Sequence, residues 1–97
     1  MTKADIVSRI SEAIGLTKVD TEAVVNGFIH SISEALINGE GVEIRRFGTF
    51  KVKEKKSRIA RNPKTGEKVT VPEKMVPFFK PSKELKKIIN NSFKNKQ

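Results

Sequence analysis

The chain has 97 residues, of which 32% are charged, and it carries a net charge of +9 with no cysteine. This length allows one domain, and the lack of cysteine excludes disulfides, thiol nucleophiles and thiolate metal sites. No apolar run reaches the roughly twenty residues of a membrane span, and residues 1–5 do not begin a signal peptide. We therefore expect a single-domain cytoplasmic protein with no membrane partner.

The charge is distributed unevenly along the chain. Residues 1–40 carry three basic and six acidic residues, whereas residues 41–97 carry seventeen basic and five acidic ones. This pattern is typical of a scaffold that carries a basic surface for nucleic acid. The only histidine, His30, has polar neighbours on its helix face, and we find no phosphate loop or acid–base pair. We expect no catalytic residue, no cofactor and no metal.

A helix is expected over residues 2–14. Thr2 and Asp5 match a capping box, and Gly15 suits a left-handed helix end. Isoleucines at every fourth position give this helix one apolar stripe, which predicts a core or partner surface and implies no chemistry.

A second, longer helix is expected over residues 17–38, with Gly39 as its stop. Its apolar band, from Val24 to Leu36, is wider than one short neighbouring helix can cover. We expect a second copy of the chain to bury the rest, because so short a chain has little core of its own. The alternative is that the following sheet covers the whole band.

Three strands and a last helix are expected after Gly41. Strands at 42–45, 49–55 and 75–79 predict a three-stranded antiparallel sheet, in which Pro77 requires an edge position or a bulge. Ser82 is a suitable N-cap for the last helix, which is expected to lose its pattern from Asn90 onward. Every phenylalanine except Phe93 falls in a core-like position.

The segment 51–74 predicts a long hairpin that projects into solvent. It has nine Lys or Arg residues against three acids, and it is polar on both faces. Turn residues from Asn62 to Gly66 mark its tip. Pro63 has two interpretations, a turn residue or an apolar wedge, and a few of the lysines could serve only to protect a sheet edge.

Three motifs occur in order: RFGTF at 46–50, ARNPKTGE at 60–67 and PFFKPSK at 77–83. With the two opening helices they resemble the HU/integration host factor family of bacterial histone-like DNA-bending proteins. The resemblance implies an α+β fold in which two N-terminal helices and a three-stranded antiparallel sheet with a protruding β-arm are followed by a short C-terminal helix, all in an intertwined dimer. Arg46 and Ser82 depart from it, since many members have glycine at both positions.

The resemblance also implies a division of the single domain 1–97. Residues 1–40 would form the helical dimerisation part, residues 41–81 the sheet with a β-arm at 53–74, and residues 82–93 the C-terminal helix. Pro63 would intercalate between base pairs in the minor groove. The residues expected to bind DNA are Lys3, Arg46, Lys53, Lys55, Lys56, Arg58, Arg61, Asn62, Pro63, Lys64, Lys68, Lys74, Lys80, Lys83 and Lys86; whether Arg46 faces DNA stays open.

The function expected is architectural: binding of double-stranded DNA in the minor groove by two arms, with bending or compaction of the duplex in a bacterial nucleoid. Bent, nicked, gapped or A/T-rich sites should be preferred, because the minor groove offers a degenerate code and deformable DNA costs less to bend. A site-specific bender of the integration host factor type is the main alternative, and a basic RNA-binding protein is a weaker one. Both a homodimer and a heterodimer with a paralogue stay open.

Overall fold

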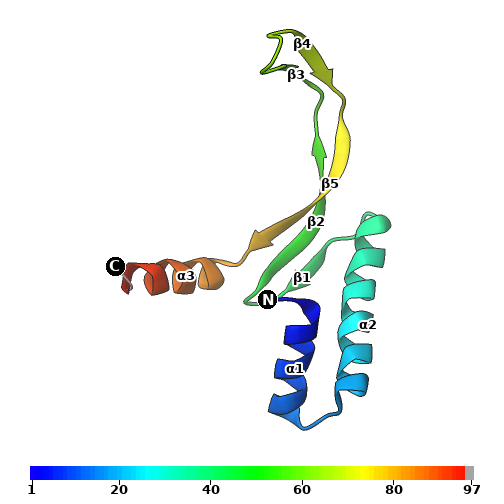
Figure 1. Cartoon of the computed structure of the whole chain (residues 1–97), viewed down its shortest axis with the longest axis vertical. Coiled ribbons are helices and arrows are strands. Elements are labelled where there is room, and N and C mark those ends of the chain that lie inside the picture. The colour runs from blue at the N-terminus through cyan, green and yellow to red at the C-terminus, as the bar shows by residue number, and fades with distance from the viewer. Residues whose placement is uncertain (96–97) are drawn as a thin grey trace. The chain divides into compact units, whose positions relative to one another are not determined.

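The computed structural model describes residues 1–95 and shows three helices and five strands, drawn in Figure 1. Two compact units are distinguished, Met1–Ala35 and Leu36–Gln97. This division falls within the second helix, so the single domain over 1–97 stays a prediction. Among the helices of the described residues, none has the length and apolarity that a bilayer crossing requires.

The first unit is a helical hairpin whose ends are set by local hydrogen bonds. Helix α1 (Lys3–Ile14) starts with a complete capping box, in which the Thr2 side chain accepts from the Asp5 N–H at 3.3 Å. The chain leaves α1 through Gly15 at a φ of 74°. Helix α2 (Lys18–Ile37) starts where the Thr17 hydroxyl accepts from the Asp20 N–H at 3.1 Å. Both predicted helices are confirmed to within one residue at each end.

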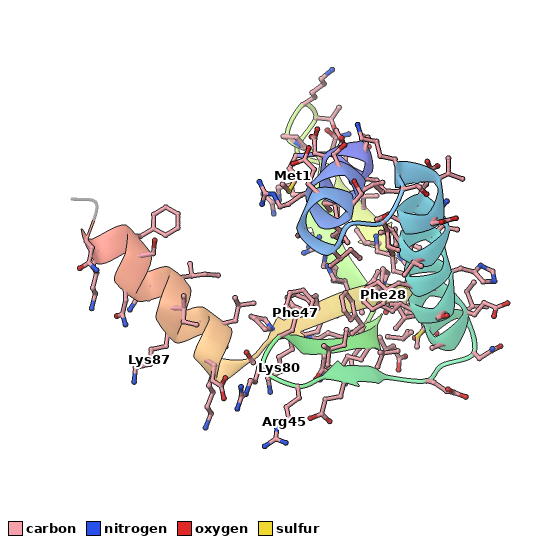
Figure 2. The ribbon with its side chains drawn as sticks, turned by 90° about the horizontal axis from the view of Figure 1, so that it is seen from below. Met1, Phe28, Arg45, Phe47, Lys80 and Lys87 are labelled. Carbon is pink, nitrogen blue, oxygen red and sulfur yellow. The ribbon has the colours of Figure 1, made fainter. Side chains whose placement is uncertain are left out.

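This unit buries very little apolar surface by itself. Val7, at 5% exposure, is the one buried apolar side chain in the described part of the chain. An apolar hollow of about 360 Å³ lies between the two helices, and Phe28, labelled in Figure 2, lines it while 54% exposed. The other side chains lining the hollow are also apolar: Ile6, Ile10, Val24, Val25 and Ile29. The helical unit alone therefore leaves the apolar band of α2 uncovered, which is the surface that the predicted dimer would bury.

The second unit contains the sheet and the arm. Strands β1 (Val42–Ile44), β2 (Gly48–Lys55) and β5 (Lys74–Pro81) form an antiparallel sheet in the order β1-β2-β5. Strands β3 (Arg58–Arg61) and β4 (Lys68–Val71) pair further along the same hairpin (Figure 1). The three-stranded sheet and the long arm are confirmed, and Pro77 lies on an edge strand as expected.

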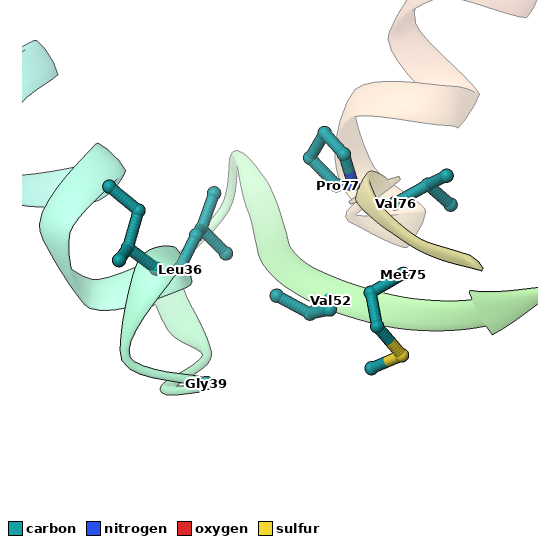
Figure 3. Close-up of a pocket in the computed structure, with 7 residues that line it drawn as sticks. Leu36, Gly39, Val52, Met75, Val76 and Pro77 are labelled. Carbon is teal, nitrogen blue, oxygen red and sulfur yellow. The ribbon is translucent and has the colours of Figure 1, made fainter.

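Aromatic side chains hold one face of the sheet. The Phe79 ring lies 5.0 Å from the Phe47 ring and 4.8 Å from the Phe50 ring, measured between centroids. Gly48 is required here, because a Cβ atom would lie 2.6 Å from the Lys80 carbonyl oxygen and 2.7 Å from the Phe79 ring. A second apolar hollow, of about 450 Å³, opens on this unit beside Val52, Met75 and Pro77 (Figure 3).

The two residues that depart from the family motif, Arg46 and Ser82, meet at the turn between β1 and β2. The Phe47 N–H donates to the Ile44 carbonyl at 3.0 Å, and Arg46 has a φ of 70°, a value that glycine adopts more readily. The Ser82 hydroxyl donates to the Arg46 carbonyl at 2.8 Å and accepts from the Leu85 N–H at 3.1 Å. The two departures are therefore in contact, and Ser82 both caps the last helix and ties it to the turn.

Helix α3 (Lys83–Asn95) begins at the predicted cap but runs further than predicted. The expectation that it ends at residue 93 and frays from Asn90 is wrong for residues up to Asn95, and the same expectation for residues 96–97 lies outside the described residues. Phe93 stands four residues after Ile89 and continues the apolar stripe, while Lys94 in the last turn suits the negative end of the helix dipole.

Replacing Arg46 by glycine should stabilise the fold. The substitution relieves a left-handed conformation and raises the free energy of unfolding by about 1 kcal/mol. The Arg46–Glu84 ion pair that it removes is 3.8 Å long and well exposed, so its removal offsets little of this gain. Denaturant unfolding at a fixed protein concentration measures the effect. Arg45→Gly, at the neighbouring position without a positive φ, is the matched control and should lower the stability.

Candidate nucleic-acid interface

The arm is one continuous ribbon with a short interruption. Lys55 pairs with Lys74 at the end of the β2–β5 ladder, and Arg58 pairs with Val71 at the start of the β3–β4 ladder. Two residues separate these pairs on each strand, so the register is kept across the gap. Residues 56–57 and 72–73 lie opposite each other there, and Pro72 has no N–H to donate to a ladder. The alternation of side chains between the two faces therefore continues to the tip.

One face of the β2–β5 ladder collects basic side chains. Residues directly opposite in an antiparallel pair project to the same side. Thr49 pairs with Lys80, Lys53 with Val76 and Lys55 with Lys74, so these side chains share the face opposite to the aromatic cluster. Four of the residues predicted to bind DNA are brought together on this face: Lys53, Lys55, Lys74 and Lys80.

Like charges stand directly across the arm from one another. The cross-strand pairs include Lys55 with Lys74 and Arg61 with Lys68. The two ion pairs found within residues 1–95 are His30–Glu34 and Arg46–Glu84, and both lie outside the arm. Directly opposed like charges are destabilising. The arm thus carries positive charge that its own carboxylates leave uncompensated.

The tip is a compact turn closed by backbone hydrogen bonds. The Asn62 N–H donates to the Glu67 carbonyl at 2.8 Å, and the Gly66 N–H donates to the Asn62 carbonyl at 2.7 Å. The Asn62 side-chain oxygen accepts from the Lys64 N–H at 2.9 Å, and Gly66 has a φ of 73°. Asn62 therefore helps to build the tip, and its side-chain amide donors stay available. Pro63 is exposed at the end of the ribbon.

A second basic group lies where the sheet meets α3. Arg45, Arg46, Lys80 and Lys83 line a groove of about 310 Å³, together with Glu43. Figure 2 labels Arg45 and Lys80 in this region and Lys87 further along α3. The groove brings three residues of the predicted interface into one place, and it adds Arg45, which is not among the residues expected to bind DNA.

The remaining predicted residues are spread over the molecule. Lys56 and Arg58 line a hollow of about 310 Å³ at the interruption of the arm. Lys64 is exposed at the tip, and Lys86 is exposed on the first turns of α3. Lys3 belongs to the helical unit, where its ammonium donates to the Asn26 side-chain oxygen at 2.9 Å. The expected role of Lys3 in DNA binding therefore stays a prediction.

Two side chains on the basic face were missed. Lys51 stands directly across from Phe78, on the same side as Lys53 and Lys55. The expectation that every phenylalanine except Phe93 is core-like is wrong for Phe28, Phe47 and Phe78, which are 54%, 43% and 38% exposed. Among these, Phe78 lies on the face opposite to the aromatic cluster. The sequence contained the signal, because two consecutive phenylalanines in a strand point to opposite faces.

Comparisons with known proteins agree with this geometry. A family model described as bacterial DNA-binding protein matches residues 1–90. The integration host factor subunit beta of Nitrosomonas eutropha is 43% identical over 95 residues, covering 97% of this chain and 90% of that relative. The same subunit of Marinobacter nauticus is also 43% identical, with 97% of both chains covered.

Solved structures show the same fold. Anabaena HU in a cocrystal with DNA superposes with a TM-score of 0.84 at 35% identity, covering 92% of this chain and 97% of that one. HU from Thermotoga maritima gives a TM-score of 0.66 at 29% identity, with 92% and 98% covered. The chain therefore belongs to the HU/integration host factor family of bacterial DNA-binding proteins. Members of this family are architectural, non-enzymatic DNA-binding proteins of the bacterial nucleoid, and the dimer is typical of their fold.

The repulsion between Lys55 and Lys74 gives a prediction for the free protein. Lys74→Glu replaces a repulsive cross-strand pair by an attractive one, so the β2–β5 ladder should gain roughly 0.2–1 kcal/mol. Amide hydrogen exchange of residues near the pair measures this gain as slower exchange. Lys64→Glu changes the charge equally at the tip, away from any ladder pair, and should leave those amides unchanged. Faster exchange in Lys74→Glu would show that the opposed lysines do not repel one another.

Proposed function

We propose that the protein binds duplex DNA in the minor groove with two arms, one from each subunit of a dimer, and bends the duplex. The observation that carries this proposal is the uncompensated basic ribbon that ends in the exposed Pro63. DNA phosphates supply the missing negative charge, and binding releases the counterions that the phosphates had condensed.

The dimensions of the arm fit this role. Lys55 to Pro63 spans eight residues, which corresponds to roughly 26 Å of extended strand. This length is several times the width of the minor groove, about 6 Å, so an arm can follow the groove and two arms can embrace a duplex. Backbone hydrogen bonds over residues 62–67 close the tip as a tight turn.

Separate parts of the surface take separate roles in this complex. Pro63 wedges between base pairs, with Arg61 and Asn62 beside it in the groove, because an apolar tip can unstack a base step and kink the duplex. Other basic residues of the arm, the sheet and the first turns of α3 hold phosphates: Lys53, Lys55, Lys56, Arg58, Lys64, Lys68, Lys74, Lys80, Lys83, Lys86 and Arg46. Lys3 holds the DNA that flanks the kinks.

We propose that two copies of this chain form the dimer. The apolar hollow between α1 and α2 and the hollow beside Val52 have the apolar lining that a partner copy would bury. Residues 1–40 then act as the dimerisation part, and residues 41–81 carry the sheet and arm. The protein acts in the bacterial nucleoid, and it binds DNA without catalysing a reaction on it.

Specificity should come mainly from the shape and deformability of the DNA. Arg61 and Asn62 are the side chains at the tip that could reach base edges, and the minor groove distinguishes few base pairs. Nicked, gapped, bent or A/T-rich sites cost less to deform, so these sites are preferred.

A second candidate is a subunit of a site-specific DNA bender. The names of the relatives favour it, since those with 43–45% identity are integration host factor beta subunits. In that case the physiological partner would be a different chain. The mass of the purified protein in solution separates the two candidates: a stable dimer of this chain alone supports the general bender, whereas a species that assembles only with a paralogue supports the site-specific one.

Substitution of Pro63 tests the wedge directly. Pro63→Ala removes most of the apolar volume at the tip, so the bend of a bound duplex should decrease while the fold is kept. Pro63→Leu restores an apolar wedge and should preserve the bend. Fluorescence energy transfer between the two ends of the duplex measures the bend at saturating protein. Equal transfer for the wild type and both variants would assign Pro63 to turn formation alone.

A further inference from the structure

Phe78 lies on the face of β5 opposite to the aromatic cluster, directly across from Lys51. The ring contacts of the aromatic cluster join Phe47, Phe50 and Phe79 on the opposite face of the sheet. Phe78 is 38% exposed and lies among basic side chains. An exposed ring on a binding face calls for an explanation other than packing of that cluster.

Two lysine side chains are gathered over this ring. The Lys51 ammonium lies 5.8 Å from the centroid of the Phe78 ring, and the Lys53 ammonium lies 4.9 Å from it. Lys51 is directly opposite Phe78 in the ladder, whereas Lys53 reaches it diagonally from two residues along β2. Cations within about 6 Å of a ring centroid are attracted by the electron-rich face of the ring.

The ring orients the ammonium groups without satisfying their hydrogen-bonding capacity. Each ammonium has three donors, and a ring face accepts none of them as strongly as an anionic oxygen does. Within the described residues, the two ion pairs are His30–Glu34 and Arg46–Glu84. No carboxylate of these residues forms an ion pair with Lys51 or Lys53. Long lysine side chains lose rotamer freedom when they are fixed, so holding them beforehand lowers the entropic cost of binding an anion.

We propose that Lys51, Lys53 and Phe78 form an additional phosphate-binding site for the DNA backbone, at the base of the arm. Lys51 and Lys53 bind phosphate oxygens, and Phe78 is a positioning residue that holds both ammonium groups ready. The site adds Lys51 and Phe78 to the interface and deepens the proposed function, on which it rests. A purely structural role, in which the lysine stems only shield the ring from water, predicts no effect on DNA binding.

The test measures affinity for a duplex of random sequence over a salt series, using the full chain. Lys51→Gln should lower the affinity and reduce the slope of log K against log salt by about 0.9 for each phosphate that the variant no longer neutralises. Phe78→Leu keeps both charges, so the slope should stay unchanged while the affinity falls by about three-fold. In the double variant the effect of Phe78→Leu should shrink, because Lys51 is no longer there to be positioned.

Matched controls separate this site from general charge and packing effects. Lys18→Gln removes the same charge from the helical unit, and it should bind as the wild type does. Phe78→Tyr keeps a ring and should retain affinity, which preserves the test if Phe78→Leu fails to fold. The ring-current shift of the Lys53 ε-methylene protons should be present in the wild type and absent in Phe78→Leu.

The outcomes distinguish failure of this site from failure of the proposed function. If the wild type binds and bends DNA but Lys51→Gln keeps the wild-type salt slope, the additional site is wrong and the proposed function stands. Independent effects of Phe78→Leu and Lys51→Gln in the double variant would equally overturn the positioning role. If the wild type itself neither bends DNA nor shows salt-dependent affinity, the proposed function fails first.

Discussion

Uncompensated positive charge along a two-stranded ribbon is the constraint on which the structure depends. Lys55 faces Lys74 and Arg61 faces Lys68 across the arm, and both ion pairs of the described residues lie elsewhere. The ribbon by itself has little folding stability, because its opposed like charges repel one another and its faces bury almost no apolar surface. Its cost is offset when an anion binds. DNA supplies such anions as a regular row of phosphates along each strand.

The rest of the molecule gives this arm a firm base and a defined tip. Gly48 allows the Phe79 ring to pack against the turn into β2, and Ser82 ties the start of α3 to the carbonyl of Arg46. At the far end, Asn62 and Gly66 close a turn that leaves Pro63 exposed. A single short chain lacks a large hydrophobic core. A partner copy that buried the two apolar hollows would complete one.

Much of this arrangement could be predicted from the sequence, because it is determined locally. The capping box at Thr2, the glycine after α1 and the turn residues from Asn62 to Gly66 act over a few residues and set the element ends. The period of two residues in a strand likewise predicts that Lys51, Lys53 and Lys55 share a face. The resemblance to the family then predicted how these elements are arranged in the fold, which secondary-structure propensity alone does not provide.

Some of the features that escaped prediction depend on contacts between distant parts of the chain. The hydrogen bond from Ser82 to Arg46 spans 36 residues, and the positive φ of Arg46 is visible only once the turn is built. The end of α3 at Asn95 was missed because polar residues 90–92 interrupt the apolar stripe, which resumes at Phe93. The outward position of Phe78 could have been inferred from its neighbour Phe79, since adjacent strand residues face opposite sides.

The most direct measurement is binding to three DNAs of equal length: a random duplex, a nicked or gapped duplex, and an A/T-rich duplex. Affinity is followed over a salt series, with energy transfer between the duplex ends as the measure of bending. Architectural binding through phosphates predicts a steep salt dependence, tighter binding to the two deformable DNAs and a shortened end-to-end distance. Weak binding to all three with no change in end-to-end distance would contradict it and would direct attention to structured RNA as the ligand.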